Sequence, residues 1–147
     1  MASGLYVNYK NLMLGLDTAA HTIADWDTDT IKVGIVSGAD YTENLSTDQD
    51  WADTGYALDT CYSSETTQTL ADISISAGVV DNTADITFTG VAIAGSPEAD
   101  VDAIVHYRSS GTASTDTLLL FHDGFSAVTP NGGDIVIAYH SSGIFSL

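Results

Sequence analysis

Short runs in which apolar and polar residues alternate constrain the fold of this chain most, because a period of two is typical of half-buried strands. The clearest run predicts a central strand over residues 30–36, where Ile31, Val33 and Ile35 alternate with their neighbours. Similar alternation predicts a hairpin that joins Ile73, Ile75 and Val79 to Ile86, Phe88 and Val91 about an Asp81-Asn82 turn, a second hairpin of residues 101–108 and 117–122 with a long polar tip, and a last strand over residues 134–140. Roughly six to eight strands predict a mainly β domain, a β-sandwich or jelly roll.

Helical spacing is clear only near the start of the chain. Leu5, Tyr9 and Leu12 recur at intervals of three or four residues, which predicts a short amphipathic helix over about residues 4–14 that ends near Gly15. The length of 147 residues predicts one domain over residues 1–147.

Residues 37–70 are polar and weakly patterned. We expect a long excursion with fragments of strand, in which Ser46 or Thr47 caps a helical turn that runs through Trp51. Segments of this length without clear structure are usually functional or stabilised by a neighbouring chain. The sequence therefore predicts that this excursion becomes ordered on assembly.

The charge of the chain is strongly one-sided. It has 20 acidic and 3 basic residues, a formal net charge of −17, and no Lys or Arg in residues 33–107. Binding to nucleic acid or to an anionic membrane surface requires clustered cations, so we expect neither. No apolar run approaches the roughly 20 residues of a membrane span, residues 1–16 lack the pattern of a signal peptide, and Cys61 has no second cysteine with which to pair. An apolar fraction of 44% predicts a folded, soluble, acidic domain.

The best candidate metal ligands are three alternating carboxylates, Asp25, Asp27 and Asp29. Thr30 and Val36 stand where an EF-hand loop requires its glycine and its bidentate glutamate. A solvated turn before the strand is therefore the favoured interpretation, and weak Ca²⁺ binding is the alternative.

Residues for catalysis are not apparent in the pattern. His106, His122 and His140 lie near predicted strand ends without the spacing of zinc ligands, and Cys61 has no histidine close by in the chain. No G-x-S-x-G nucleophile motif occurs. We expect no catalytic residue and no cofactor, and a metal-dependent hydrolase is the last of our hypotheses.

Apolar residues close the chain, at Ile144, Phe145 and Leu147. Terminal segments are usually polar and loose unless something holds them. A last edge strand within the domain's own core accounts for them, and an interface with another copy or a partner is the alternative. The amphipathic helix near the start leaves the same two possibilities open.

Several segments, in order along the chain, resemble a family of small tailed-bacteriophage proteins, the capsid decoration or cement proteins. They are Leu5-Tyr6 with Tyr9-Lys10 and Leu12-Met13, the run from Asp27 to Val36 (DTDTIKVGIV), Trp51-Ala52-Asp53, and the run from Ser142 to Leu147 (SGIFSL). Residues 54–70 depart from the family pattern, which has a Gly-rich hairpin there. None of these motifs carries chemistry.

The resemblance implies a β-sandwich that assembles as a homotrimer on the outer surface of an icosahedral head, after synthesis in the host cytoplasm. Its partner there is the major capsid protein, whose neighbouring subunits it bridges and stabilises. The interface candidates are Leu5, Tyr6, Tyr9, Trp51, Ile144 and Phe145.

The alternative function is a carbohydrate- or host-binding module of a phage head or tail fibre. In such a module exposed aromatic side chains stack on sugar rings. Trp26, Trp51, Tyr56 and Tyr62 are the candidates for that role.

Overall fold

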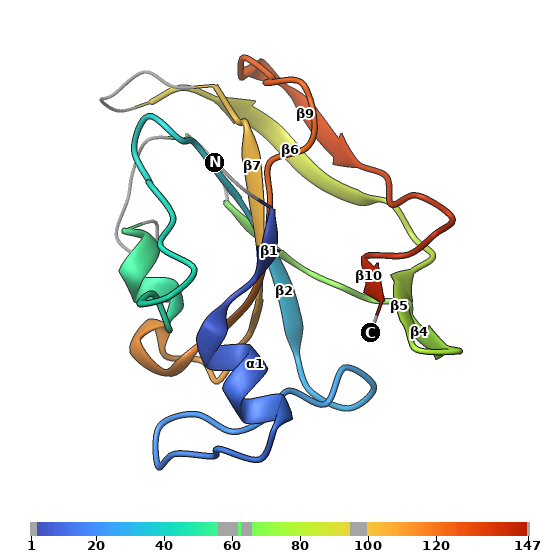
Figure 1. Ribbon diagram of the computed structural model, residues 1–147. Coiled ribbons are helices and arrows are strands. Elements are labelled where there is room, and N and C mark those ends of the chain that lie inside the picture. The colour runs from blue at the N-terminus through green and yellow to red at the C-terminus, as the bar shows by residue number, and fades with distance from the viewer. Residues whose placement is uncertain (1–2, 56–61, 63–65, 95–99, 147) are drawn as a thin grey trace.

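The structure is a computed structural model that describes residues 3–55, 62, 66–94 and 100–146, and its architecture is mainly β (Figure 1). Within those residues, ten strands form antiparallel sheets of five, three and two strands. The predicted β-sandwich-like fold is confirmed. A jelly roll is not, because the sheets differ from the eight-stranded double sheet of that fold.

The largest sheet, called here the main sheet, forms the first layer of the molecule. Its strand order is β1 (Gly4–Leu5), β8 (Thr117–His122), β7 (Ala103–Arg108), β2 (Ile31–Val36) and β3 (Thr67–Thr69). The three inner strands are buried over almost their whole length. A strand covered on both faces needs apolar residues at successive positions, which explains why β7 and β8 read as nearly continuous apolar runs.

Two smaller sheets form the second layer (Figure 1). One is a ribbon of β6 (Ile86–Ala92) and β9 (Asn131–Ile137), and the other has the order β10 (Phe145–Ser146), β5 (Val79–Asn82) and β4 (Ile73–Ser76). In Figure 1 the ribbon crosses the upper right of the molecule and the three-stranded sheet lies below it.

The helical segments are short. The helix α1 covers Val7–Met13 and not residues 4–14, because Gly4 and Leu5 pair with β8 as strand β1. Two 3-10 turns follow, η1 (Trp51–Thr54) and η2 (Ala113–Thr115). No helix in the part of the chain that the structure describes is long and apolar enough to cross a membrane.

The hairpin predictions had different outcomes. The pairing of β7 with β8 is confirmed, and η2 lies in its polar tip. The hairpin about Asp81-Asn82 is wrong, since these two residues lie inside β5. The actual turn is at Ala77 and Gly78, both with positive φ, and it joins β4 to β5, while β6 pairs with the distant β9.

Residues 37–55 of the predicted excursion pack on one face of the main sheet. The Trp51 indole stacks on the Tyr107 ring with centroids 4.7 Å apart, and it covers Gly34, where a Cβ atom would lie 2.3 Å from the indole. Backbone hydrogen bonds from Trp51 to Asp116 and from Leu118 to Gln49 fix the segment beside β8. Residues 37–55 of the excursion therefore pack against the chain's own sheet, and ordering on assembly stays a prediction.

The helical turn in this segment begins later than predicted. Asp50, and neither Ser46 nor Thr47, precedes η1 as its N-cap residue. The Asp53 carboxylate accepts hydrogen bonds from the backbone N–H groups of Gln49 and Asp50, at 2.7 and 3.0 Å. The bond from Asp50 is part of a capping box in which Asp53 is the third residue of the turn, and this arrangement fits a turn that begins at residue 51.

Candidate functional site

Exposed apolar side chains gather at two places on the surface. Seven large apolar residues are exposed among those described, namely Leu14, Leu16, Ile23, Ile75, Phe125, Val128 and Val136. Five of these seven line two apolar hollows, and Leu14 directly follows a residue that lines one of them. Single exposed apolar residues are ordinary on a protein surface, whereas their concentration at hollows marks a candidate binding surface.

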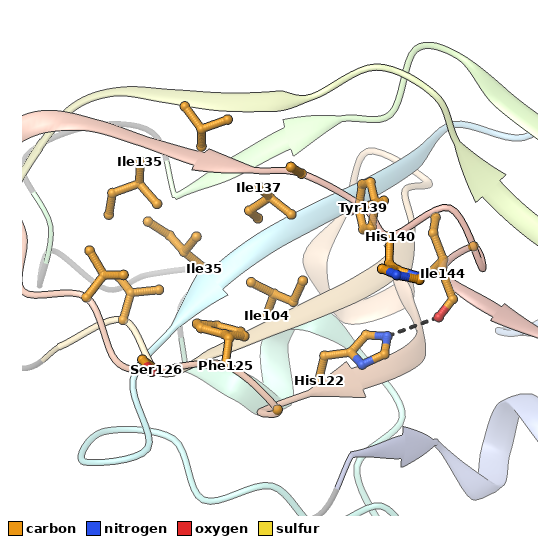
Figure 2. A pocket seen from close by; sticks show the side chains of 16 residues that line it. Ile35, Ile104, His122, Phe125, Ser126, Ile135, Ile137, Tyr139, His140 and Ile144 are labelled. Carbon is orange, nitrogen blue, oxygen red and sulfur yellow. Dashed lines mark hydrogen bonds between the residues drawn. The ribbon is translucent and has the colours of Figure 1, made fainter.

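The first hollow, called here the layer cleft, lies between the main sheet and β9 and has a volume of about 530 Å³. Figure 2 shows Ile35 and Ile104 of the main sheet on one side and Ile135 and Ile137 of β9 on the other. Phe125 lies at its border, on the loop that follows β8.

The layer cleft is open because the two strands of the ribbon pack unequally. In β6, Phe88 and Val91 are fully buried, whereas the residues of β9 are exposed or half-buried. The pairing of the two strands has an irregularity between Phe88 and Val91, and such irregularities bend and twist a strand. The second layer therefore closes on the main sheet along β6 and stands away from it along β9.

Two histidines lie between the layers near the inner end of the cleft. The fully buried His106 shares a 2.8 Å hydrogen bond with the Tyr139 hydroxyl through Nε2, while its Nδ1 has no hydrogen-bond partner in the structure. Burial, and then the nearby His122, lower the pKa of His106 to about 3, and burial is the main reason why the pKa of His122 is also lowered. Both rings are therefore neutral at physiological pH and add no charge to the cleft.

The second hollow, called here the helix hollow, has a volume of about 490 Å³ and lies where the end of α1 meets the three-stranded sheet. Met13, Ile23, Ile75 and Phe145 line it, together with the buried Trp26. The Trp26 indole N–H donates to the Tyr9 hydroxyl at 2.8 Å, which satisfies the polar end of a buried ring.

The two hollows meet at the neighbouring residues Ile144 and Phe145, called here the wall. Ile144 lines the layer cleft, and its neighbour Phe145 lines the helix hollow with its ring 5.2 Å from that of Trp26. The His122 Nε2 atom donates to the carbonyl oxygen of Ile144 at 3.2 Å, the bond drawn in Figure 2. The wall is anchored on its other side by the pairing of Phe145 with Val80 in β5.

The residues predicted as interface contacts are mostly part of the core. Tyr6, Tyr9, Trp51 and Ile144 are at most 5% exposed, so their side chains offer little surface to a partner, and the own-core explanation of Ile144 applies. Leu5 and Phe145 are half-buried. Only Tyr9, Ile144 and Phe145 line a hollow, and Leu147 lies outside the described residues.

Sequence reasoning missed the exposed apolar residues themselves. Ile75 in β4 and Val136 in β9 lie on strands whose outward positions are normally polar. In β9, apolar residues occupy both the inward and the outward positions, and this departure from alternation was a signal that the sequence offered. No local pattern distinguishes Ile23, Phe125 and Val128, because they lie outside the named strands and helices. Their exposure depends on which distant strands pair.

Two of the three aspartates considered for Ca²⁺, Asp25 and Asp29, accept hydrogen bonds from the local backbone. Asp25 Oδ1 accepts from the N–H of Asp27, Asp29 Oδ2 accepts from the N–H of Asp25, and Asp29 lies 3.8 Å from the Arg108 guanidinium. No group of three or more His, Cys, Asp or Glu residues suited to a metal ion occurs in the described residues. The bonds are those of the solvated turn that the sequence favoured.

The aromatic residues expected to stack on sugars are also buried. Trp26, Trp51 and Tyr62 are each no more than 5% exposed, which is incompatible with their predicted role as exposed stacking platforms. Tyr56 and Cys61 lie outside the described residues.

A buried polar cluster joins three residues that are far apart in the sequence. His21 Nδ1 lies 3.2 Å from the Thr117 hydroxyl, and His21 Nε2 lies 3.5 Å from Asp50 Oδ1. Burial is the main cause that raises the pKa of the Asp50 carboxyl, and His21 opposes this rise. Thr117 is fully buried and lines neither the layer cleft nor the helix hollow, so this cluster connects η1 to β8 inside the domain.

Comparisons of the chain with protein-family models, with curated proteins and with solved structures found no match.

Proposed function

We propose that this chain is a capsid decoration protein, a structural and non-enzymatic subunit that binds the outer surface of a tailed-phage head. In this proposal it acts as a homotrimer and bridges neighbouring subunits of the major capsid protein, which it stabilises. The resemblance of the run from Asp27 to Val36 and of the closing Gly143-Ile144-Phe145 to that family motivates the proposal.

The observation that carries it is the presence of two separate apolar hollows on one acidic domain. A protein that bridges two neighbours needs at least two contact surfaces, and five of the seven exposed large apolar residues lie at these hollows. Burying one such side chain fully contributes about 1.5–3 kcal/mol. Repeating two modest contacts around a trimer gives strong total binding through multivalency.

The net charge of −17 is compatible with this role. A strongly acidic domain repels the packaged nucleic acid and stays dissolved before assembly. Specific attachment then depends on apolar contacts and on complementary charges of the partner, since the chain has only 3 basic residues of its own.

The test is co-sedimentation of the purified chain with heads of the phage that encodes it, together with its mass by light scattering. We expect saturable binding to heads and a mass of three 15.4 kDa chains. Ile75→Asn, in the helix hollow, is expected to weaken head binding about tenfold or more. Thr87→Asn is the matched control, because Thr87 is exposed on β6 and lines neither hollow.

Failure to bind heads would contradict the proposed function directly. A stable monomer that nevertheless binds heads would remove the trimer and keep the decoration role. Equal loss of binding in the Ile75 and Thr87 variants would show that the helix hollow is not the contact surface.

A further inference from the structure

The outer edge of β9 is available for pairing beside the layer cleft. β9 pairs with β6 on one side, and no strand of the described residues pairs with its other side. An unpaired strand edge presents a row of backbone N–H and C=O groups, which another extended chain can bind as an added strand. Ile135 and Ile137 of the same strand lie half-buried in the cleft.

An extended segment added at this edge would place alternate side chains in the cleft. Successive side chains of a strand point to opposite sides, so every second residue of the segment faces the main sheet. The cleft volume of about 530 Å³ falls within the range of about 300–1,000 Å³ typical of ligand sites. Its walls are the apolar side chains of Ile35, Ile104 and Phe125, which favour aliphatic occupants.

The charge around the cleft determines what else that segment must carry. Four aspartates directly adjoin lining residues in the chain, namely Asp100, Asp102, Asp123 and Asp134. None of the three basic residues of the chain lines the cleft. Adjacent residues lie within the roughly 8 Å over which charges interact at physiological salt, so the charge around the cleft is negative.

We propose that the layer cleft and the free edge of β9 bind an extended segment of a protein partner in which aliphatic residues alternate with Lys or Arg. This inference rests on the proposed function, under which the major capsid protein supplies the segment. The aliphatic residues fill the cleft, the backbone adds a third strand to the β6–β9 ribbon, and the cationic residues face the aspartates.

A second copy of the same chain fits this site poorly. Two copies each carry a charge of −17, and the three basic residues are dispersed over α1, β2 and the end of β7. Arg108 is engaged by Thr22 and Asp29. An approaching second copy therefore brings more negative charge to an acidic opening, which opposes association there.

The experiment uses two designed peptides that differ only in charge, acetyl-KVKIKVK-amide and acetyl-EVEIEVE-amide. Each is titrated into the purified full chain while backbone amide NMR signals are recorded. We expect the cationic peptide to shift the signals of Asn131–Ile137 in β9 in a saturable way that weakens as salt is raised. We expect the acidic peptide to bind at least about tenfold more weakly.

Two matched variants locate the binding. Ser126 is exposed and lines the cleft, so Ser126→Trp fills its opening without removing a core side chain. Ser114→Trp introduces the same ring at an exposed position of η2, away from both hollows. Binding of the cationic peptide should be lost in the Ser126 variant and kept in the Ser114 variant, with both showing the dispersed amide spectrum of the wild type.

Each of the following results would overturn the inference. The first is equal binding of both peptides, and the second is peptide binding that persists in the Ser126 variant. The third is self-association of the wild type that the Ser126 variant abolishes, because this result would identify a second copy as the occupant. Tight binding of a neutral apolar dye in the cleft, with no binding of either peptide, would identify a small apolar ligand as the occupant in place of a protein segment.

Head binding separates this inference from the proposed function. If wild type and the Ser126 variant bind heads equally, the decoration role stands and the cleft is not its contact. If the wild type does not bind heads but binds the cationic peptide through β9, the cleft inference stands and the decoration role fails.

Discussion

The two faces of the main sheet are covered in different ways. We expect the closely packed face to contribute mainly to stability, and the face with the open cleft to contribute mainly to binding. On one face residues 37–55 lie against the sheet, and Trp51 fills the space above Gly34 with its ring against Tyr107. On the other face the β6–β9 ribbon closes along β6 and leaves a cleft of about 530 Å³ along β9. Identical substitutions on the two faces should therefore have different consequences.

The largest expected effect is the loss of the Trp51 ring. Trp51→Ala removes a 4%-exposed side chain that stacks on Tyr107 and should lower the free energy of unfolding by about 3–5 kcal/mol. Equilibrium denaturation in urea measures this. A loss below about 1 kcal/mol would show that the two faces do not differ in packing.

Adding a methyl group tests the same contrast in the opposite direction. In Gly34→Ala the new Cβ atom would lie 2.3 Å from the Trp51 indole, so we expect a loss of about 3 kcal/mol, at the upper end for overpacking. Gly124→Ala is the matched control on the cleft side, where a Cβ meets nothing within 4 Å, and should change stability by less than about 0.5 kcal/mol. Thermal melts of both variants, in one buffer, compare the two faces directly.

The histidines of the cleft side make stability depend on pH. The pKa of His106 is lowered in the folded chain to about 3, from 6.5 in the unfolded chain, so unfolding takes up a proton between these values. The stabilisation is complete above the unfolded pKa and is lost as pH falls below it. Lowering the pH from 7 to 5 should therefore reduce the free energy of unfolding by about 2 kcal/mol through His106 alone.

His106→Gln removes the titrating group and keeps a polar atom toward the Tyr139 hydroxyl. Unfolding free energies measured from pH 7 to pH 5 should then fall less steeply in the variant than in the wild type. His122, whose pKa is also lowered mainly by burial, retains a part of the slope. Parallel curves for the two proteins would rule out His106 as a source of acid sensitivity.

The smallest expected effect on stability belongs to the border of the cleft. Phe125 is 41% exposed, so Phe125→Ala should change the free energy of unfolding by less than about 0.5 kcal/mol. Because Phe125 lines the cleft, the same substitution should weaken binding of the cationic peptide several-fold. Loss of stability without loss of binding would assign Phe125 to the core.

Local patterns were sufficient where strands close in sequence pair with each other. The β7–β8 hairpin was predictable because both strands are apolar and a polar tip joins them. The pattern failed between residues 70 and 92, where strict alternation continues through two possible turns. Ala77-Gly78 makes the turn, and β6 then pairs with β9, whose paired residues lie 39 to 51 positions further along the chain.

The candidate site was less predictable than the fold. Apolar residues near the start and end of the chain suggested contact surfaces, but Tyr6, Tyr9 and Ile144 complete the core. Whether an apolar side chain is covered depends on residues that approach from elsewhere in the sequence. Trp51 illustrates this, since its partners Gly34 and Tyr107 belong to two different strands.

The sequence by itself determined the β class, the inner position of the strand at Ile31–Val36 and the acidic charge. These follow from local periodicity and from composition, which do not depend on how the chain folds back. Only the tertiary structure decided where the apolar surface remains open. The hollows exist because the sheets approach each other unequally, and long-range pairing, which no local pattern encodes, sets that approach.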